Sequence, residues 1–172
     1  MALRERDFDL HALYEALDER RHSRNLTFAA LTAEVNRHRT RLRPIAASTI
    51  TSLKDKRVAE GDGVLQMLIW LERPPESFIP GMANAGDPHF RLPQLTRGQI
   101  LRWNTQSLHG ALDARRRERG LTWAEVARDV GGFTPGMLTN LASGPRIGFP
   151  RVMRLVRWLG KPAVSFTRIA EW

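Results

Sequence analysis

Basic side chains are the residues of this sequence best suited to chemistry, and they occur in two dense runs. Seven lysines and arginines lie within residues 37–57 against one acidic residue, Asp55, and residues 115–119 read Arg-Arg-Arg-Glu-Arg. Such clusters neutralise phosphates and release condensed counterions. The whole chain has 172 residues and a formal charge of +9. This charge favours a polyanionic partner, with a solvated basic surface as the alternative for each residue.

Motifs for catalysis and metal binding do not occur in the sequence. It has no glycine-rich phosphate loop and no His-Glu-x-x-His pattern, and its histidines are scattered without ligand spacing. The only tyrosine, Tyr14, lies too early to be the late nucleophile of a tyrosine recombinase. We therefore expect no enzymatic activity, no cofactor and no metal ion. A nuclease built from carboxylates is the enzymatic alternative that the sequence leaves open.

Composition also restricts where the protein works. The sequence contains no cysteine, which excludes disulfides and thiolate metal sites and fits a reducing cytoplasm. No apolar run approaches the roughly 18 residues that a membrane span needs, and acidic charge appears at Glu5 before any apolar stretch of a signal peptide. We expect a cytoplasmic protein with no membrane partner.

An internal repeat determines the expected domain organisation. Residues 16–31 align with residues 111–126 at an offset of 95, and nine of the sixteen positions are identical. Residues 64–78 align with residues 152–166 at an offset of 88, so the first copy carries seven extra residues between the two blocks. The matched positions include tryptophan, proline and a Ser-Phe pair. Each copy is too long for a solenoid repeat and should form a domain with its own core.

We therefore expect two domains, copy one at residues 8–79 and copy two at residues 103–168. The connecting segment between them, residues 80–102, is rich in proline and glycine, which is typical of a flexible linker. Its last part, from residue 96 onward, could form a helical turn or pack on a domain.

Helix signals recur at equivalent places in both copies. Asp9 and Asn104 suit the N-cap of a first helix, which should end near Asn25 or Gly120. Thr27 and Thr122 suit the N-cap of a second helix, whose apolar residues recur on one face. Two further helices are predicted in each copy, at residues 46–55 and 62–71 in copy one and at 135–143 and 150–159 in copy two. No segment alternates like a strand, so we predict an all-α fold.

Four aromatic residues lie on the apolar faces of these helices. Phe28 and Trp70 in copy one correspond to Trp123 and Trp158 in copy two. Because they fall on apolar helical stripes, we expect them to be core residues rather than platforms for stacked bases.

The order of elements in copy two resembles the lambda-repressor/Cro-like (XRE) helix-turn-helix family. The matching residues include Arg119-Gly120-Leu121-Thr122, Gly132-Phe133-Thr134, Leu138, Leu141 and Gly144. Copy one matches less well, because residues 36–44 replace the short turn before its third helix. The resemblance implies two tandem DNA-binding domains of the lambda-repressor-like fold.

Two departures from the family pattern affect the expected contacts. The family usually has a glutamine that touches the DNA backbone near the start of its second helix, where this sequence has Phe28 and Trp123. The family also tends to pair an arginine of the first helix with a glutamate late in the third. Here Arg21 and Arg116 face Lys54 and Ala142, so we expect these two arginines to be free for phosphate.

The resemblance implies that the third helix of each copy enters the major groove, where every base pair presents a distinct hydrogen-bonding pattern. Asn140 is the strongest candidate, because an amide can bond N6 and N7 of adenine together. The full set of base-facing candidates is Ala47, Ser48, Thr49 and Ser52 in copy one and Pro135, Gly136, Met137 and Asn140 in copy two. The phosphate candidates are Arg41, Arg43, Thr51, Lys54, Lys56 and Arg57 in copy one and Thr139, Arg146 and Arg151 in copy two.

These features predict a prokaryotic transcription regulator, acting as repressor or activator at the nucleoid, that binds double-stranded DNA in a sequence-specific manner. Because the two sets of base-facing residues differ, we expect an asymmetric site with two different halves. Because one chain carries both DNA-binding copies, a monomer or weak dimer should be enough to bind the site. As an alternative, one copy reads DNA and the other contacts a protein partner such as RNA polymerase.

Overall fold

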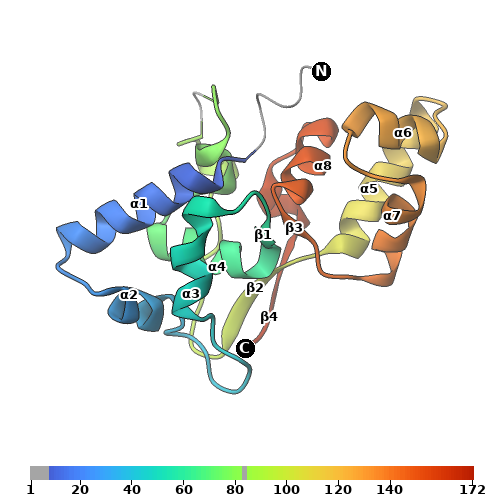
Figure 1. Ribbon diagram of the computed structural model, residues 1–172. Coiled ribbons are helices and arrows are strands. Elements are labelled where there is room, and N and C mark those ends of the chain that lie inside the picture. Colours follow the sequence, from blue (N-terminus) through green and yellow to red (C-terminus); the bar gives the residue numbers. More distant parts are fainter. Residues whose placement is uncertain (1–7, 83–84) are drawn as a thin grey trace.

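The computed structural model describes residues 8–82 and 85–172. Both copies have the same order of elements, and the copies lie side by side with short strands between them (Figure 1). Copy one contains α1 (Leu10–Ser23), α2 (Phe28–Val35), α3 (Ala47–Thr51), β1 (Ala59–Glu60) and α4 (Gly61–Leu71). Copy two contains α5 (Thr105–Glu118), α6 (Trp123–Val130), α7 (Pro135–Asn140), β3 (Gly148–Phe149) and α8 (Arg151–Leu159).

The predicted helix boundaries agree with the structure because local caps define them. The side chains of Asp9 and Asn104 accept backbone N–H groups at the starts of α1 and α5, and those of Thr27 and Thr122 do so for α2 and α6. After α1, Asn25 adopts a left-handed backbone with φ of 53°. The third helices finish as 3₁₀ turns at Ser52–Asp55 and Leu141–Ser143, and later 3₁₀ turns lie at Pro75–Phe78, Pro88–Phe90 and Ala163–Phe166.

The all-α prediction is wrong, because the chain also forms two small antiparallel sheets. The fold is mixed, with 57% helix and 9% strand. β1 pairs with β3, and β2 (Gln99–Trp103) pairs with β4 (Thr167–Glu171). The strands are short and their partners lie far away in the sequence. A run of two to five residues carries too little alternation to reveal such pairing.

The β1–β3 ladder relates the two copies by a local two-fold axis. With the repeat offset of 88, Glu60 is equivalent to Gly148, and these two residues pair with each other. Ala59 pairs with Phe149, and the amide of Gly61 donates to the carbonyl of Ile147 at 3.0 Å. A residue that pairs with its own repeat equivalent lies at a two-fold axis, as in a symmetric dimer interface. The chain is therefore a covalent pseudo-dimer at this ladder.

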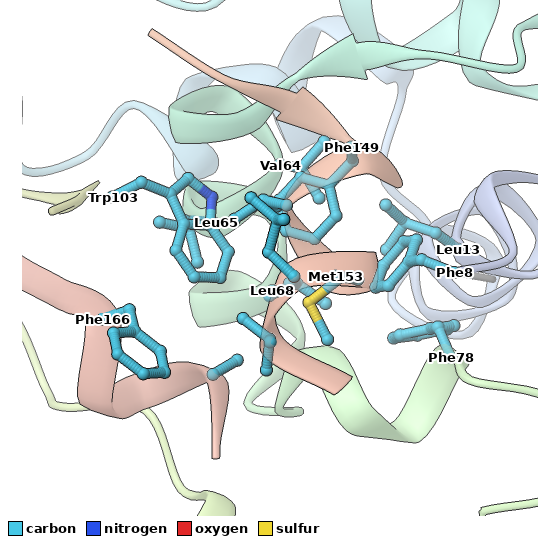
Figure 2. Packing of buried hydrophobic residues seen from close by; sticks show 14 of the residues in the cluster. Phe8, Leu13, Val64, Leu65, Leu68, Phe78, Trp103, Phe149, Met153 and Phe166 are labelled. Carbon is cyan, nitrogen blue, oxygen red and sulfur yellow. The ribbon is translucent and has the colours of Figure 1, made fainter. Parts of the chain in front are cut away.

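The hydrophobic core is continuous across the two copies. Phe149 of copy two is completely buried, and its ring centroid lies 4.7 Å from that of Phe8 and 5.5 Å from that of Trp103. Figure 2 shows Phe149 and Met153 next to Val64, Leu65 and Leu68 of α4 and to the aromatic rings of copy one. Each copy therefore completes its core with side chains from the other.

The last part of the connecting segment packs on copy one, which is one of the two alternatives expected for it. Leu95, Ile100 and Leu101 are buried, and residues 99–103 form strand β2 rather than a helical turn. The buried side chain of Gln66 in α4 donates to the carbonyl of Leu101 at 2.6 Å and accepts from its amide at 3.3 Å. Asp62 accepts the amide of Trp103 at 2.9 Å. These bonds fix the last part of the segment to copy one.

A buried carboxyl joins the copies at the far end of α4. Oε1 of Glu76 accepts the amide of Ala163 at 2.6 Å, and the side chain is only 2% exposed. Burial raises the pKa of Glu76, against the opposing effect of this hydrogen bond. The folded protein thus holds this proton more tightly than the unfolded chain does, so ionisation of Glu76 lowers stability as pH rises above the ordinary pKa.

We therefore expect Glu76→Gln to stabilise the protein at neutral pH. The amide keeps an oxygen for Ala163 and carries no charge to desolvate. Chemical unfolding from pH 4 to pH 8 should show a gain in unfolding free energy that grows as pH rises through the raised pKa. The matched control is Glu118→Gln on the exposed side of α5. A gain that shrinks with rising pH would contradict the assignment.

Candidate nucleic-acid interface

Copy two contains a compact helix-turn-helix made by α6 and α7. Thr122 and Glu125 form a reciprocal capping box at the start of α6, and these bonds from Thr122 lower the pKa of Glu125. Two glycines with positive φ, Gly131 and Gly132, make the turn. Thr134 then caps α7 by accepting the amide of Met137 at 3.1 Å. Local sequence therefore determines both the turn and the start of the candidate reading helix.

The base-facing candidates of α7 lie on its outer side. Leu138 is fully buried and anchors the helix, whereas Pro135, Gly136 and Asn140 are exposed and Met137 is half-buried. The side-chain oxygen of Asn140 lies 3.2 Å from the hydroxyl of Ser143, which donates to it. The same hydroxyl lies closer to the backbone carbonyl of Asn140, at 2.8 Å, so the amide nitrogen of Asn140 is left for a partner. The arrangement leaves the outer side of α7 open to a partner.

The equivalent helix of copy one presents a similar outer surface. Ile50 of α3 and Leu53 just after it are fully buried. Ser48 is exposed, and the other three base-facing candidates, Ala47, Thr49 and Ser52, are half-buried. This helix therefore has an inner side at Ile50 and an outer side at Ser48.

The connection between α2 and α3 distinguishes copy one. Residues 36–46 join these helices, whereas residues 131–134 join α6 and α7. Asn36 braces the longer loop, since its side chain donates to the carbonyl of Ile45 at 2.9 Å and accepts its amide at 2.8 Å. The seven extra residues of copy one therefore form an ordered loop next to the candidate reading helix.

Segments from the other end of the chain also hold this loop. The amides of Thr40 and Arg41 both donate to the carbonyl of Trp172 at 3.0 Å. The Trp172 indole donates to the carbonyl of Arg43 at 3.3 Å. Burial and the nearby Arg37 lower the pKa of His38. The side chains of Arg41 and Arg43 remain exposed on this braced loop.

The remaining phosphate candidates lie on both copies. Lys54, Lys56 and Arg57 are exposed directly after α3, and Arg146 and Arg151 are exposed on either side of β3. The hydroxyls of the two threonines donate to backbone carbonyls within their own helices, at 3.4 Å for Thr51 and 3.1 Å for Thr139. The hydroxyl proton of each threonine is therefore already used.

Strand pairing brings basic residues of the two copies together. Arg57 precedes β1 and Arg151 follows β3, so the antiparallel register carries both to the same end of the ladder. Arg146 lies at the other end of the ladder. Burial raises the pKa of Asp62, and the positive charge of Arg146 opposes this increase. Sequence reasoning found these residues singly. Only the ladder reveals that they flank the junction between the copies.

The prediction that Arg21 and Arg116 are free for phosphate is wrong. Arg21 bonds Asp18 at 2.7 Å and the carbonyl of Leu26 at 2.9 Å. Arg116 repeats this pattern with Asp113 at 2.7 Å and Leu121 at 3.0 Å. Each guanidinium also lies over an aromatic ring, at 4.2 Å from the Phe28 centroid and 5.0 Å from that of Trp123.

The carboxylates come from the same helix, three residues earlier, and replace the missing partner in the third helix. The Arg116 hydrogen bond is the main cause of the lowered pKa of Asp113. A repeated Asp-x-x-Arg spacing before an aromatic residue was the sequence signal that could have revealed these contacts. The two arginines join α1 to α2 and α5 to α6.

The described residues contain no group of three or more histidine and acidic side chains arranged to hold a metal ion. Over the same ranges, no helix combines the length and apolar character needed to cross a bilayer. Comparison with protein-family models, curated proteins and solved structures finds no match to this chain.

Proposed function

We propose that this protein is a sequence-specific binder of double-stranded DNA that regulates transcription at the nucleoid. The single observation that carries the proposal is the β1–β3 ladder, which joins two helix-turn-helix-like copies about a local two-fold axis. Symmetric dimers of such domains bind half-sites about 34 Å apart. A covalent pseudo-dimer presents two reading helices in the same way without needing a second chain.

The two halves of the DNA site should differ in sequence. The candidates on α7 include an amide, Asn140, and a thioether, Met137, whereas those on α3 are alanine, serine and threonine. Because the copies share one core, the protein itself sets the spacing between the half-sites. The exposed lysines and arginines of the ladder and of residues 41–57 supply the phosphate contacts.

Selection of sites from random double-stranded DNA tests the proposal. The expected result is a two-part site with unequal halves at one fixed spacing, and an affinity that falls steeply with salt. Equal palindromic halves would contradict the assignment of different readers, and freely variable spacing would contradict a rigid pseudo-dimer. No enrichment above unrelated DNA would overturn the function.

Within that site, Asn140→Ala should weaken binding by about 1–3 kcal/mol, because a bidentate amide–adenine pair contributes that much discrimination. The loss should be confined to one base pair of the copy-two half-site. The matched control is Ser143→Ala, which removes the hydroxyl next to Asn140 but keeps the amide. Titrations with all four bases at that position measure the effect, and an unchanged base preference would remove Asn140 from the site.

One observation favours a second candidate function, in which copy one contacts a protein such as RNA polymerase. Copy one has the braced loop of residues 36–46 where copy two has a tight turn. The full chain carrying Arg41→Glu and Arg43→Glu separates the two functions. If copy one binds DNA, the double variant should bind the selected DNA site more weakly, whichever half-site is varied, and its affinity should depend less on salt. If copy one instead contacts a protein, the variant should bind DNA as the wild type does.

A further inference from the structure

A pocket of about 230 Å³ lies where the two copies and the connecting segment meet. Ile79, Met82 and Phe90 form its wall on the side of copy one and the connecting segment. Met153 and Val156 of α8 line it from copy two. Its volume is below the roughly 300–1,000 Å³ of sites for drug-sized ligands. It therefore suits a molecule with a single ring.

Besides the half-buried Arg157 of α8, the pocket is lined by a buried carboxyl, that of Glu76. Oε1 accepts the Ala163 amide, but Oε2 is buried without a hydrogen-bond partner. A buried polar oxygen without a donor costs free energy, and native proteins satisfy most such groups. A hydroxyl or N–H group in the pocket would supply the donor.

The outer end of the pocket has the opposite character. His89 and Lys161 line it and are exposed, and the positive field of His89 acts on Glu76. An anionic group placed there would remain partly in water next to a lysine ammonium. A cationic ligand would be repelled from the same end.

We propose that this pocket binds a small aromatic carboxylate that carries a hydroxyl or N–H donor at the opposite end of its ring. The donor bonds Oε2 of Glu76, the ring packs between Met82, Phe90 and Met153, and the carboxylate lies near Lys161. Flexible methionine side chains move to uncover the buried oxygen. Because the walls come from both copies, an occupant strengthens their contact. This inference does not depend on the proposed DNA binding.

Methionine methyl NMR on the full chain provides the test. Met82 and Met153 line the pocket, whereas Met137 lies on α7 and Met67 is buried in α4. The probe is 4-hydroxyphenylacetate, and phenylacetate is the matched compound without the donor. Titration should shift the Met82 and Met153 methyls and leave that of Met137 unchanged. The hydroxylated probe should bind about tenfold more tightly, as expected for a hydrogen bond to a charged group.

Two variants separate the roles within the pocket. Glu76→Gln should reduce the tenfold preference to about threefold or less, because a neutral amide is a weaker partner for the hydroxyl. Lys161→Gln should weaken both probes equally. Amide spectra show whether each variant is folded. If Glu76→Gln is not folded, Met82→Trp, which fills the pocket, replaces it as the test variant. Selective shifts with these preferences support the site. Shifts spread over all methyls, no shift at all, or equal affinity for the two probes in the wild type would overturn it.

Discussion

Replacing Phe149 with alanine is expected to lower the free energy of unfolding by about 3–5 kcal/mol, the range for a fully buried phenylalanine. The side chain is completely buried, and it packs on Phe8 of copy one and on Trp103 at the end of β2. The cavity left behind would lie between the copies. The loss should therefore destabilise both copies together.

Urea unfolding followed at separate probes measures this effect. Tryptophan fluorescence reports on both copies, since Trp70 belongs to copy one and Trp123 and Trp158 to copy two. Far-ultraviolet circular dichroism reports on all helices. The two curves should coincide and move together. The control is Ile169→Ala, at a side chain that is 47% exposed on β4. Two separated transitions, with only one shifted, would show independent domains.

Replacing Gly61 with alanine should produce the second large effect, a loss of about 3 kcal/mol, at the upper end of the usual cost of overpacking. Gly61 is equivalent to Phe149 in the repeat and pairs with the carbonyl of Ile147. A methyl group there would overlap that carbonyl oxygen and lie 2.8 Å from Cδ1 of Trp103. Since the obstacle includes backbone, relief requires the copies to separate.

Gly110→Ala provides the matched control, because both glycines lie in helices. An added Cβ at Gly110 meets nothing within 4 Å, so this variant should gain about 0.5–1 kcal/mol from helix propensity. Thermal and urea unfolding of the two variants should therefore move in opposite directions. Under the proposed function, DNA affinity should fall for Gly61→Ala and stay constant for Gly110→Ala, because only the first disturbs the spacing of α3 and α7. Equal stability of the two variants would contradict a close contact at the ladder.

Part of the candidate interface could be predicted from single helices. The buried Leu138 and Ile50, set against exposed Asn140 and Ser48, follow from helical periodicity. The partners of Arg21 and Arg116 were missed because the family pattern directed attention to the third helix, whereas the carboxylates lie one turn earlier on the same helix. The position of Arg57 and Arg151 at one end of a ladder had no local signal.

The sequence by itself determined the repeat and the helices, because capping and apolar spacing act within a few residues. Asp9, Thr27, Thr122 and Thr134 each accept a backbone N–H three residues later. The two basic runs and the missing metal and catalytic motifs could also be read directly from the sequence. These features predict a helical protein with two similar halves and a preference for a polyanion.

Only the tertiary structure decided how the halves are joined. β1 meets β3 across almost ninety residues of sequence, and Trp172 holds the loop at Thr40, so neither contact leaves a periodic pattern. A two-residue strand has no stability of its own and forms only when both copies have folded and the core around Phe149 closes. The end of the expected linker is therefore the packed strand β2, and the two copies form one pseudo-symmetric body.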